Sequence, residues 1–105
     1  MTDLSVTGFL GLSAALFGIG LFGILTRRNF ILLLISIEIA MNAAILNFVY
    51  FAAFPPGSSG LSGQSIAVVL VGFAATEVAV GLAIVLALNR LKGTINVARA
   101  NELRE

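Results

Sequence analysis

The sequence predicts an all-α membrane protein with three transmembrane helices. Composition is the first reason, because 59% of the 105 residues are hydrophobic and only 10% are charged, with a mean hydropathy of +1.09. A soluble chain of this length could not bury so much apolar surface. The second reason is the presence of three uninterrupted apolar windows. The third is that all basic side chains fall in two places along the chain.

The three apolar windows cover residues 4–25, 30–54 and 66–88. As a helix rising roughly 1.5 Å per residue, each is long enough to cross a hydrocarbon core of about 30 Å. Backbone groups inside a membrane must satisfy one another, and three spans cannot close a barrel, so each window is expected to be helical. We therefore predict a single transmembrane domain, residues 1–105, that ends in a polar tail at residues 89–105.

The distribution of basic residues predicts the orientation of the spans. Arg27 and Arg28 lie in the short connection between the first two windows, which the positive-inside rule assigns to the cytoplasm. Three crossings then place the N-terminus outside and the C-terminal tail in the cytoplasm. The connection at residues 55–64 has no basic residue, and the others fall in or next to the tail: Arg90, Lys92, Arg99 and Arg104.

Small residues predict which helix faces pack closely, because they allow helix backbones to approach one another in lipid. In the first span Gly11, Ala15 and Gly18 share one face at helical spacing, whereas Gly20 and Gly23 lie elsewhere. We predict that the first group forms a packing face. A second predicted contact face lies in the third span and consists of Gly72, Ala75, Thr76, Ala79, Ala83 and Ala87.

Two acids, Glu38 and Glu77, are the only formally charged residues between positions 30 and 88. An unpaired charge in hydrocarbon is unfavourable by about 2.5–3.5 kcal/mol on insertion scales. Counted from Arg28 and Arg90, the two acids lie roughly 15 and 20 Å inward, near the middle of the bilayer. Asn42 follows Glu38 by one turn and can hydrogen-bond it or share water with it, whereas Asn47 lies on nearly the opposite face.

A pair of acids at matching depth favours a proton relay. A carboxylic acid in a dry site is neutral, and it ionises only beside a cation, a donor network or water, so its neighbours decide its charge. The alternative is structural, since a protonated glutamate can bond a partner helix for about 0.6–2 kcal/mol. The sequence has no cysteine and no histidine, which excludes disulfides and iron–sulfur ligation, and we expect no metal site and no catalytic residue.

Three segments together resemble a known family: residues 27–29 (RRN), 37–43 (IEIAMNA) and 74–83 (AATEVAVGLA). They are similar to the K-subunit family of proton-pumping NADH:quinone oxidoreductase, respiratory complex I, and the similarity covers nearly the whole chain. The usual family form has alanine before the second glutamate, where this chain has Thr76.

The resemblance implies that Glu38 and Glu77 belong to a chain of buried ionisable groups linking the quinone end of the membrane arm to antiporter-like subunits. It implies a coupling role at the cytoplasmic surface for Arg27 and Arg28, although anchoring of the topology explains them at least as well. Flavin, iron–sulfur clusters and quinone are then expected on other subunits. We expect an obligate hetero-oligomer with other hydrophobic membrane-arm subunits, in a bacterial inner membrane and without a nucleic-acid partner.

Other classes of membrane protein fit the sequence less well. The small subunit of multisubunit sodium/proton antiporters has similar size and span number, but that family usually lacks the acid in the third span, so Glu77 counts against it. Small multidrug exporters have four spans, and the ATP synthase ring subunit has two. A purely structural membrane subunit, in which the carboxylates are only interhelical bonds, is the remaining alternative.

Overall fold

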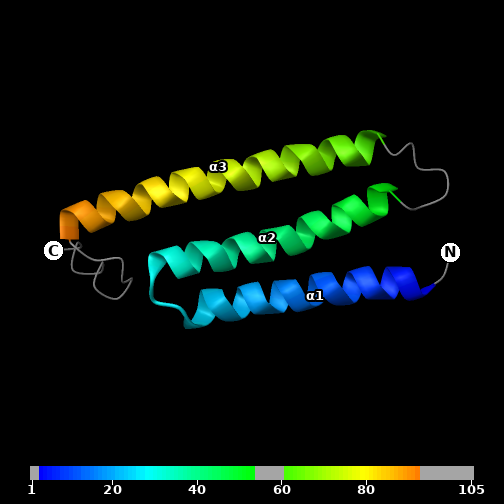
Figure 1. Ribbon diagram of the computed structural model, residues 1–105, viewed down its shortest axis with the longest axis horizontal. Helices are drawn as coiled ribbons and strands as arrows, with labels where there is room; N and C mark the ends of the chain where they lie inside the picture. Colours follow the sequence, from blue (N-terminus) through cyan, green and yellow to red (C-terminus); the bar gives the residue numbers. More distant parts are fainter. Residues whose placement is uncertain (1–2, 54–60, 93–105) are drawn as a thin grey trace.

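The computed structural model describes residues 3–53 and 61–92, which form three helices (Figure 1). They are α1 (Asp3–Thr26), α2 (Phe30–Ala53) and α3 (Leu61–Lys92). Each contains a segment long and apolar enough to cross a membrane, namely Val6–Thr26, Phe30–Ala53 and Gly63–Leu91. The prediction of an all-α chain with three spanning helices is confirmed.

Helix α3 is longer than its apolar window at both ends. It begins at Leu61, before the window at residues 66–88, and continues to Lys92. Hydropathy locates the apolar part of a helix, whereas the helix itself also includes the flanking polar residues. Residues 1–2, the part of the expected outer connection up to Gly60, and the tail from residue 93 lie outside the described residues.

The helices run antiparallel and lie side by side in one flat layer, with α2 between α1 and α3 (Figure 1). The Cα atoms extend over 57 × 24 × 16 Å, so the molecule is thinnest across the plane in which the three helices lie. Helices α1 and α3 hardly touch each other. Among the three described helices, α2 alone has a neighbour on two sides, so its contacts position both α1 and α3.

Helix α1 packs on α2 through two glycines. A Cβ added to Gly20 would lie 2.7 Å from Ala40 N and 2.8 Å from Ser36 O, and one added to Gly23 would meet the Ser36 side chain. Such distances mean that the two backbones approach closely at this point. Farther along, the Phe9 and Tyr50 rings pack with centroids 4.5 Å apart.

The predicted packing faces do not contact α2, so contacts within the described chain leave them as predictions. A Cβ on Gly11 or Gly18 would meet no described atom within 4 Å, and Ala15 is exposed. The predicted stripe on α3, from Gly72 to Ala87, is likewise exposed and points away from α2. Small residues occur on both sides of each edge helix, but those that pack on α2 are Gly20 and Gly23 on α1 and, on α3, Gly63, Ala67, Ala74 and Gly81.

The register between α2 and α3 is set by two close approaches. A Cβ on Gly81 would lie 2.6 Å from Leu34 Cδ1, and one on Gly63 would lie 3.0 Å from Ala52 Cα. Because both pairs fit one antiparallel alignment, Phe30 at the start of α2 is level with Val85. The last part of α3 therefore extends roughly 10 Å beyond α2, as Figure 1 shows at the end of α3 nearest the C-terminus.

The turn between α1 and α2 is held by hydrogen bonds on both sides. The Arg27 backbone N–H donates to the Gly23 carbonyl at 3.0 Å. At the start of α2 the Ile31 N–H donates to Asn29 Oδ1 at 2.9 Å, which makes Asn29 the N-cap of the helix. Arg27 and Arg28 are both exposed on this short turn.

Candidate functional site

Glu38 lies on the side of α2 that faces α3, at the edge of their contact. Its side chain is half-buried and lines a groove of about 330 Å³. Every other residue of the groove is apolar: Ile31, Leu34, Ile35, Ile39, Val78 and Leu82. The helix pair thus places one carboxyl group in a hydrocarbon-like recess that is open to one face of the layer.

Glu77 lies at the same level as Glu38. Glu38 follows Leu34 by one helical turn, and Glu77 precedes Gly81 by one turn on the antiparallel neighbour. Since Leu34 and Gly81 are in contact, the two acids are level along the helix axes. Glu77 is also at the centre of the Gly63–Leu91 segment, so both acids lie near the middle of the candidate membrane spans.

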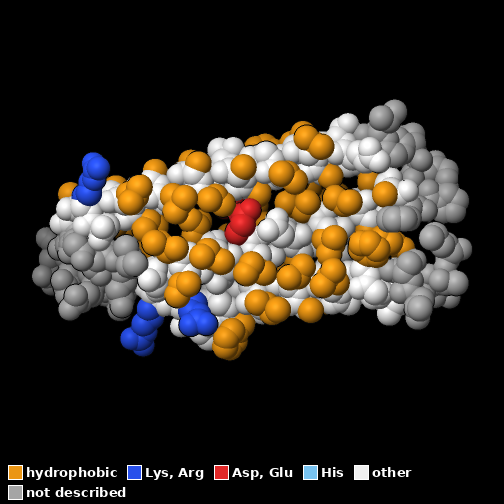
Figure 2. All heavy atoms as spheres, viewed as in Figure 1, with side chains coloured by type: hydrophobic (Ala, Val, Ile, Leu, Met, Phe, Trp, Pro, Cys, Tyr) orange, Lys and Arg blue, Asp and Glu red, His pale blue; other side chains and the backbone are white. Residues whose placement is uncertain are grey.

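The two acids open on opposite faces of the layer. The Glu38 groove includes Val78 and Leu82 from α3. A second groove of about 130 Å³ lies across the α2–α3 seam, and its α3 wall includes Gly81 and Ile84. Glu77 shares a helix face with those two residues at i, i+4 and i+7 spacing, and it is exposed. Figure 2 shows acidic side-chain atoms near the middle of the visible face, with hydrophobic side chains around them.

The carboxyl groups have no polar partner in the described part of the chain. Neither a hydrogen bond nor an ion pair within residues 3–53 and 61–92 involves Glu38, Glu77 or Asn42. Asn42 is exposed one turn beyond Glu38, so the two side chains are neighbours along the same side of α2. Any polar group that pairs with either acid therefore lies outside these residues.

Basic side chains are separated from the acids. Arg27, Arg28 and Arg90 are exposed at one end of the layer, where Figure 2 shows Lys and Arg side chains far from the acidic one. At roughly 15 Å along the axis, Arg28 does not pair with Glu38. No group of three potential metal ligands occurs in the part of the chain that the structure describes.

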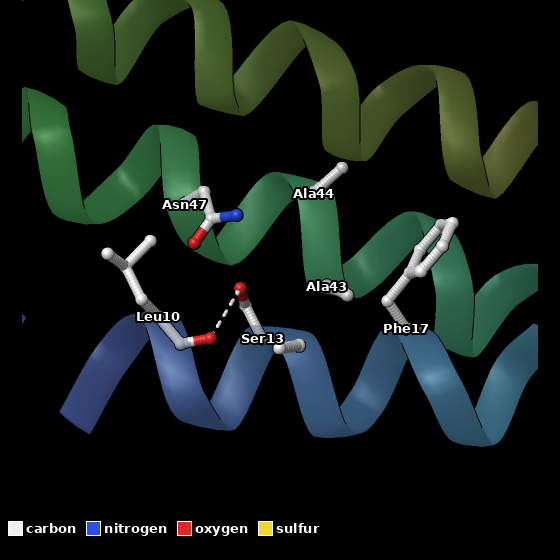
Figure 3. Close-up of a pocket in the computed structure, with 7 residues that line it drawn as sticks. Leu10, Ser13, Phe17, Ala43, Ala44 and Asn47 are labelled. Atoms are coloured by element: carbon white, nitrogen blue, oxygen red, sulfur yellow. Dashed lines mark hydrogen bonds between the residues drawn. The ribbon is translucent and has the colours of Figure 1, made fainter. Parts of the chain in front are cut away.

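Three polar residues inside the helix contacts were missed by reasoning from sequence or given no role. Ser36 is buried against Gly20 and Gly23, and its hydroxyl donates to the Leu32 carbonyl at 2.7 Å. Ser13 is buried on α1, and Asn47 faces it from α2 (Figure 3). A hydroxyl or amide in an otherwise apolar helix was the available signal.

Thr76 fits its position without a partner from another helix. Its hydroxyl donates to the Gly72 carbonyl one turn earlier at 2.9 Å, and the residue is exposed on the side of α3 away from α2. A threonine in place of alanine therefore leaves no unsatisfied hydroxyl. Its side of α3 does not include Glu77.

Taken together, these features define a class: a thin membrane protein of three spanning helices with two acids, level with each other, in the middle of its spans. Residues 8–105 match the model of a protein family described as NADH-ubiquinone/plastoquinone oxidoreductase chain 4L. The chain belongs to this family. It is a multi-pass integral membrane protein of the bacterial plasma membrane.

Several relatives are similar over almost their whole length. NADH-quinone oxidoreductase subunit K of Anaeromyxobacter sp. (strain K) is 47% identical over 97 residues, 92% of this chain and 95% of that one. Subunit K 1 of Syntrophobacter fumaroxidans is 47% identical over 100 residues, 95% and 97% of the two chains. Subunit K of Thermomicrobium roseum is 43% identical over all 105 residues of both. The expected resemblance to the K-subunit family is confirmed, and these matches favour that family over the antiporter subunit.

Proposed function

We propose that this chain is the proton-relaying membrane subunit of an NADH-quinone oxidoreductase, and that Glu38 and Glu77 move protons laterally across it. The observation that carries the proposal is the placement of the two acids, which are level with each other and open on opposite faces of one thin layer. A proton accepted on one face needs to cross only the α2–α3 seam to leave from the other.

The same placement argues against a purely structural pairing of the two acids. Two protonated glutamates that joined α2 to α3 would have to point toward each other, whereas Glu38 and Glu77 lie on different sides of the seam. Each acid therefore meets a different environment, and each can be charged or neutral according to the groups that a neighbour supplies. Asn42, one turn from Glu38, is well placed to orient water or a donor beside that acid.

Redox chemistry then belongs to other subunits. The names of the relatives describe an enzyme that oxidises NADH and reduces quinone, and this sequence has no cysteine or histidine to hold an iron–sulfur cluster. We propose a non-redox subunit of a proton-translocating complex, with flavin, iron–sulfur clusters and quinone bound elsewhere. Its partners are other hydrophobic membrane subunits, one on each face, and lipid.

The arginine turn is proposed to lie in the cytoplasm. The turn with Arg27 and Arg28 and the end of α3 with Arg90 lie at the same end of the layer (Figure 1), and the positive-inside rule assigns that end to the cytoplasmic side. The N-terminus would then be outside. Anchoring of this orientation is sufficient to account for both turn arginines, and a coupling role would appear as a pumping defect in Arg27→Gln or Arg28→Gln at unchanged topology.

Isosteric amides test the relay. Glu38→Gln and Glu77→Gln keep side-chain size and neutral hydrogen bonding but cannot release a proton. In the intact complex, we expect normal assembly and at least a tenfold loss of proton pumping per quinone reduced, since loss of a proton-transfer group commonly reduces rates by about 10²–10⁴. Pumping is measured in inverted membrane vesicles. Thr76→Ala, next to Glu77 but on the outer side of α3, is the matched control and should pump normally.

Two results would contradict the proposal. Full pumping by both amide variants would leave a structural role for the acids. Failure of either variant to assemble would show that the ionised form is needed for contacts between subunits. Purification of the tagged chain provides an independent check, because flavin and iron–sulfur subunits should accompany it.

A further inference from the structure

A second polar site lies between α1 and α2, away from the carboxylates. The two helices leave a pocket of about 460 Å³ there (Figure 3). We call this space the α1–α2 pocket. It is lined by Leu10, Ser13, Ala14, Phe17, Ala43, Ala44 and Asn47. The small side chains of the alanines leave the pocket unfilled. Ser13 and Asn47 are the two polar side chains in its lining.

Asn47 presents an unpaired oxygen to this pocket. Its Oδ1 is buried and accepts no hydrogen bond from the described residues. In Figure 3 the amide oxygen points from α2 toward α1 and the Ser13 hydroxyl. A buried acceptor without a donor is unfavourable, and native structures usually satisfy such a group with protein or ordered water.

Ser13 cannot serve as that donor in its present arrangement. It is 5% exposed, and its hydroxyl donates to the Leu10 carbonyl at 3.3 Å. A hydroxyl has a single hydrogen, so Ser13 Oγ faces the pocket as an acceptor. Two acceptors, one from each helix, therefore border the same space, and the occupant that fits them is a small molecule with two donors.

We propose that the α1–α2 pocket binds water, with one molecule donating to both Asn47 Oδ1 and Ser13 Oγ. A water molecule needs about 30 Å³ and two or more polar partners, and the pocket supplies both. Two neutral oxygens are too few for calcium, which takes about six to eight oxygen ligands. The remaining lining is apolar, so hydration is confined to the wall formed by Asn47 and Ser13.

This water site is separate from the proposed relay. Asn47 lies about 14 Å along α2 from Glu38 and faces α1, whereas Glu38 faces α3. The two sites share no lining residue. The water site instead links α1 to α2 in the half of the membrane nearer the N-terminus of α1, where it replaces a direct bond between the helices.

The test is a structure of the intact complex by electron cryomicroscopy at a resolution that shows ordered water. We expect a water peak within hydrogen-bonding distance of Asn47 Oδ1 and Ser13 Oγ, absent in Asn47→Leu and retained in Asn89→Leu, an equal change outside the pocket. Should Asn47→Leu fail to assemble, Ser13→Ala removes one acceptor and should weaken or displace the peak. A dry pocket, or a donor side chain from a neighbouring subunit on Asn47, would overturn the proposal.

Discussion

Replacing Gly23 with alanine should loosen the contact between α1 and α2. The added methyl group would overlap Ser36 Oγ and would lie 2.7 Å from Ser36 Cβ, whereas carbon atoms pack best at about 3.5–4.0 Å. Ser36 cannot easily turn aside, because it is buried and its hydroxyl donates to the Leu32 carbonyl. The helices must therefore separate by about 1 Å.

The magnitude follows from two opposing effects. Overpacking of this kind is unfavourable by about 1–3 kcal/mol, while alanine is up to about 1 kcal/mol better than glycine inside a helix. We expect a net loss of about 1–2 kcal/mol, or a factor of about 5–30 in the equilibrium. Gly18→Ala has the same helix-propensity gain without an overlap inside the described chain, so it is the matched control.

The assay is the amount of chain in the purified complex, together with the rate of heat inactivation of quinone reduction. A second change separates this contact from contacts with other subunits: Ser36→Gly removes both overlapping atoms, Oγ and Cβ, and leaves the Cα of residue 36 at 3.8 Å from the added methyl group, so Gly23→Ala with Ser36→Gly should recover part of the loss. Wild-type assembly of the single variant, or no recovery in the double variant, would refute the packing described for α1 and α2.

Other substitutions test the remaining contacts. Tyr50→Ala removes a buried ring and should lower stability by about 3–5 kcal/mol, abolishing assembly on native gels, whereas Phe51→Ala at a half-exposed ring should assemble. Asn29→Ala removes the N-cap of α2 and should lower the stability of the complex to heat by about 1 kcal/mol, while Asn29→Asp should preserve it. Gly81→Ala meets only the flexible end of Leu34 and should yield near-normal amounts of complex.

The number of spans could be predicted because hydrophobicity is a property of each segment by itself. The small residues that pack against another helix could not be predicted, because packing also depends on which residues of the neighbouring helix face them. Gly18 and Gly20 are equally small, but only Gly20 faces Ser36 and Ala40. The faces predicted from Gly11 and its neighbours lie on the outer edge of the layer, where contacts within the chain cannot test them.

For the candidate site, the level of the two acids along their helices was easier to predict than the face of the layer on which each acid opens. Distances from the arginines along the helix placed Glu38 and Glu77 near one level, and the contact between Leu34 and Gly81 places them on that level. The opposite faces on which the acids open depend on the rotation of α3 against α2, which comes from side-chain contacts absent from either helix alone. The same limitation hid the position of Asn47 opposite Ser13.

A layer only 16 Å deep has two exposed surfaces and a very small buried core. No large side chain in the described part of the chain is fully buried. A newly inserted copy therefore shows both of its acids and its glycine-rich edges to lipid until neighbours arrive. Its lifetime in the membrane should depend on how fast those neighbours are recruited. For such a chain, we expect cellular abundance to depend on the supply of its partner subunits as well as on its own rate of synthesis.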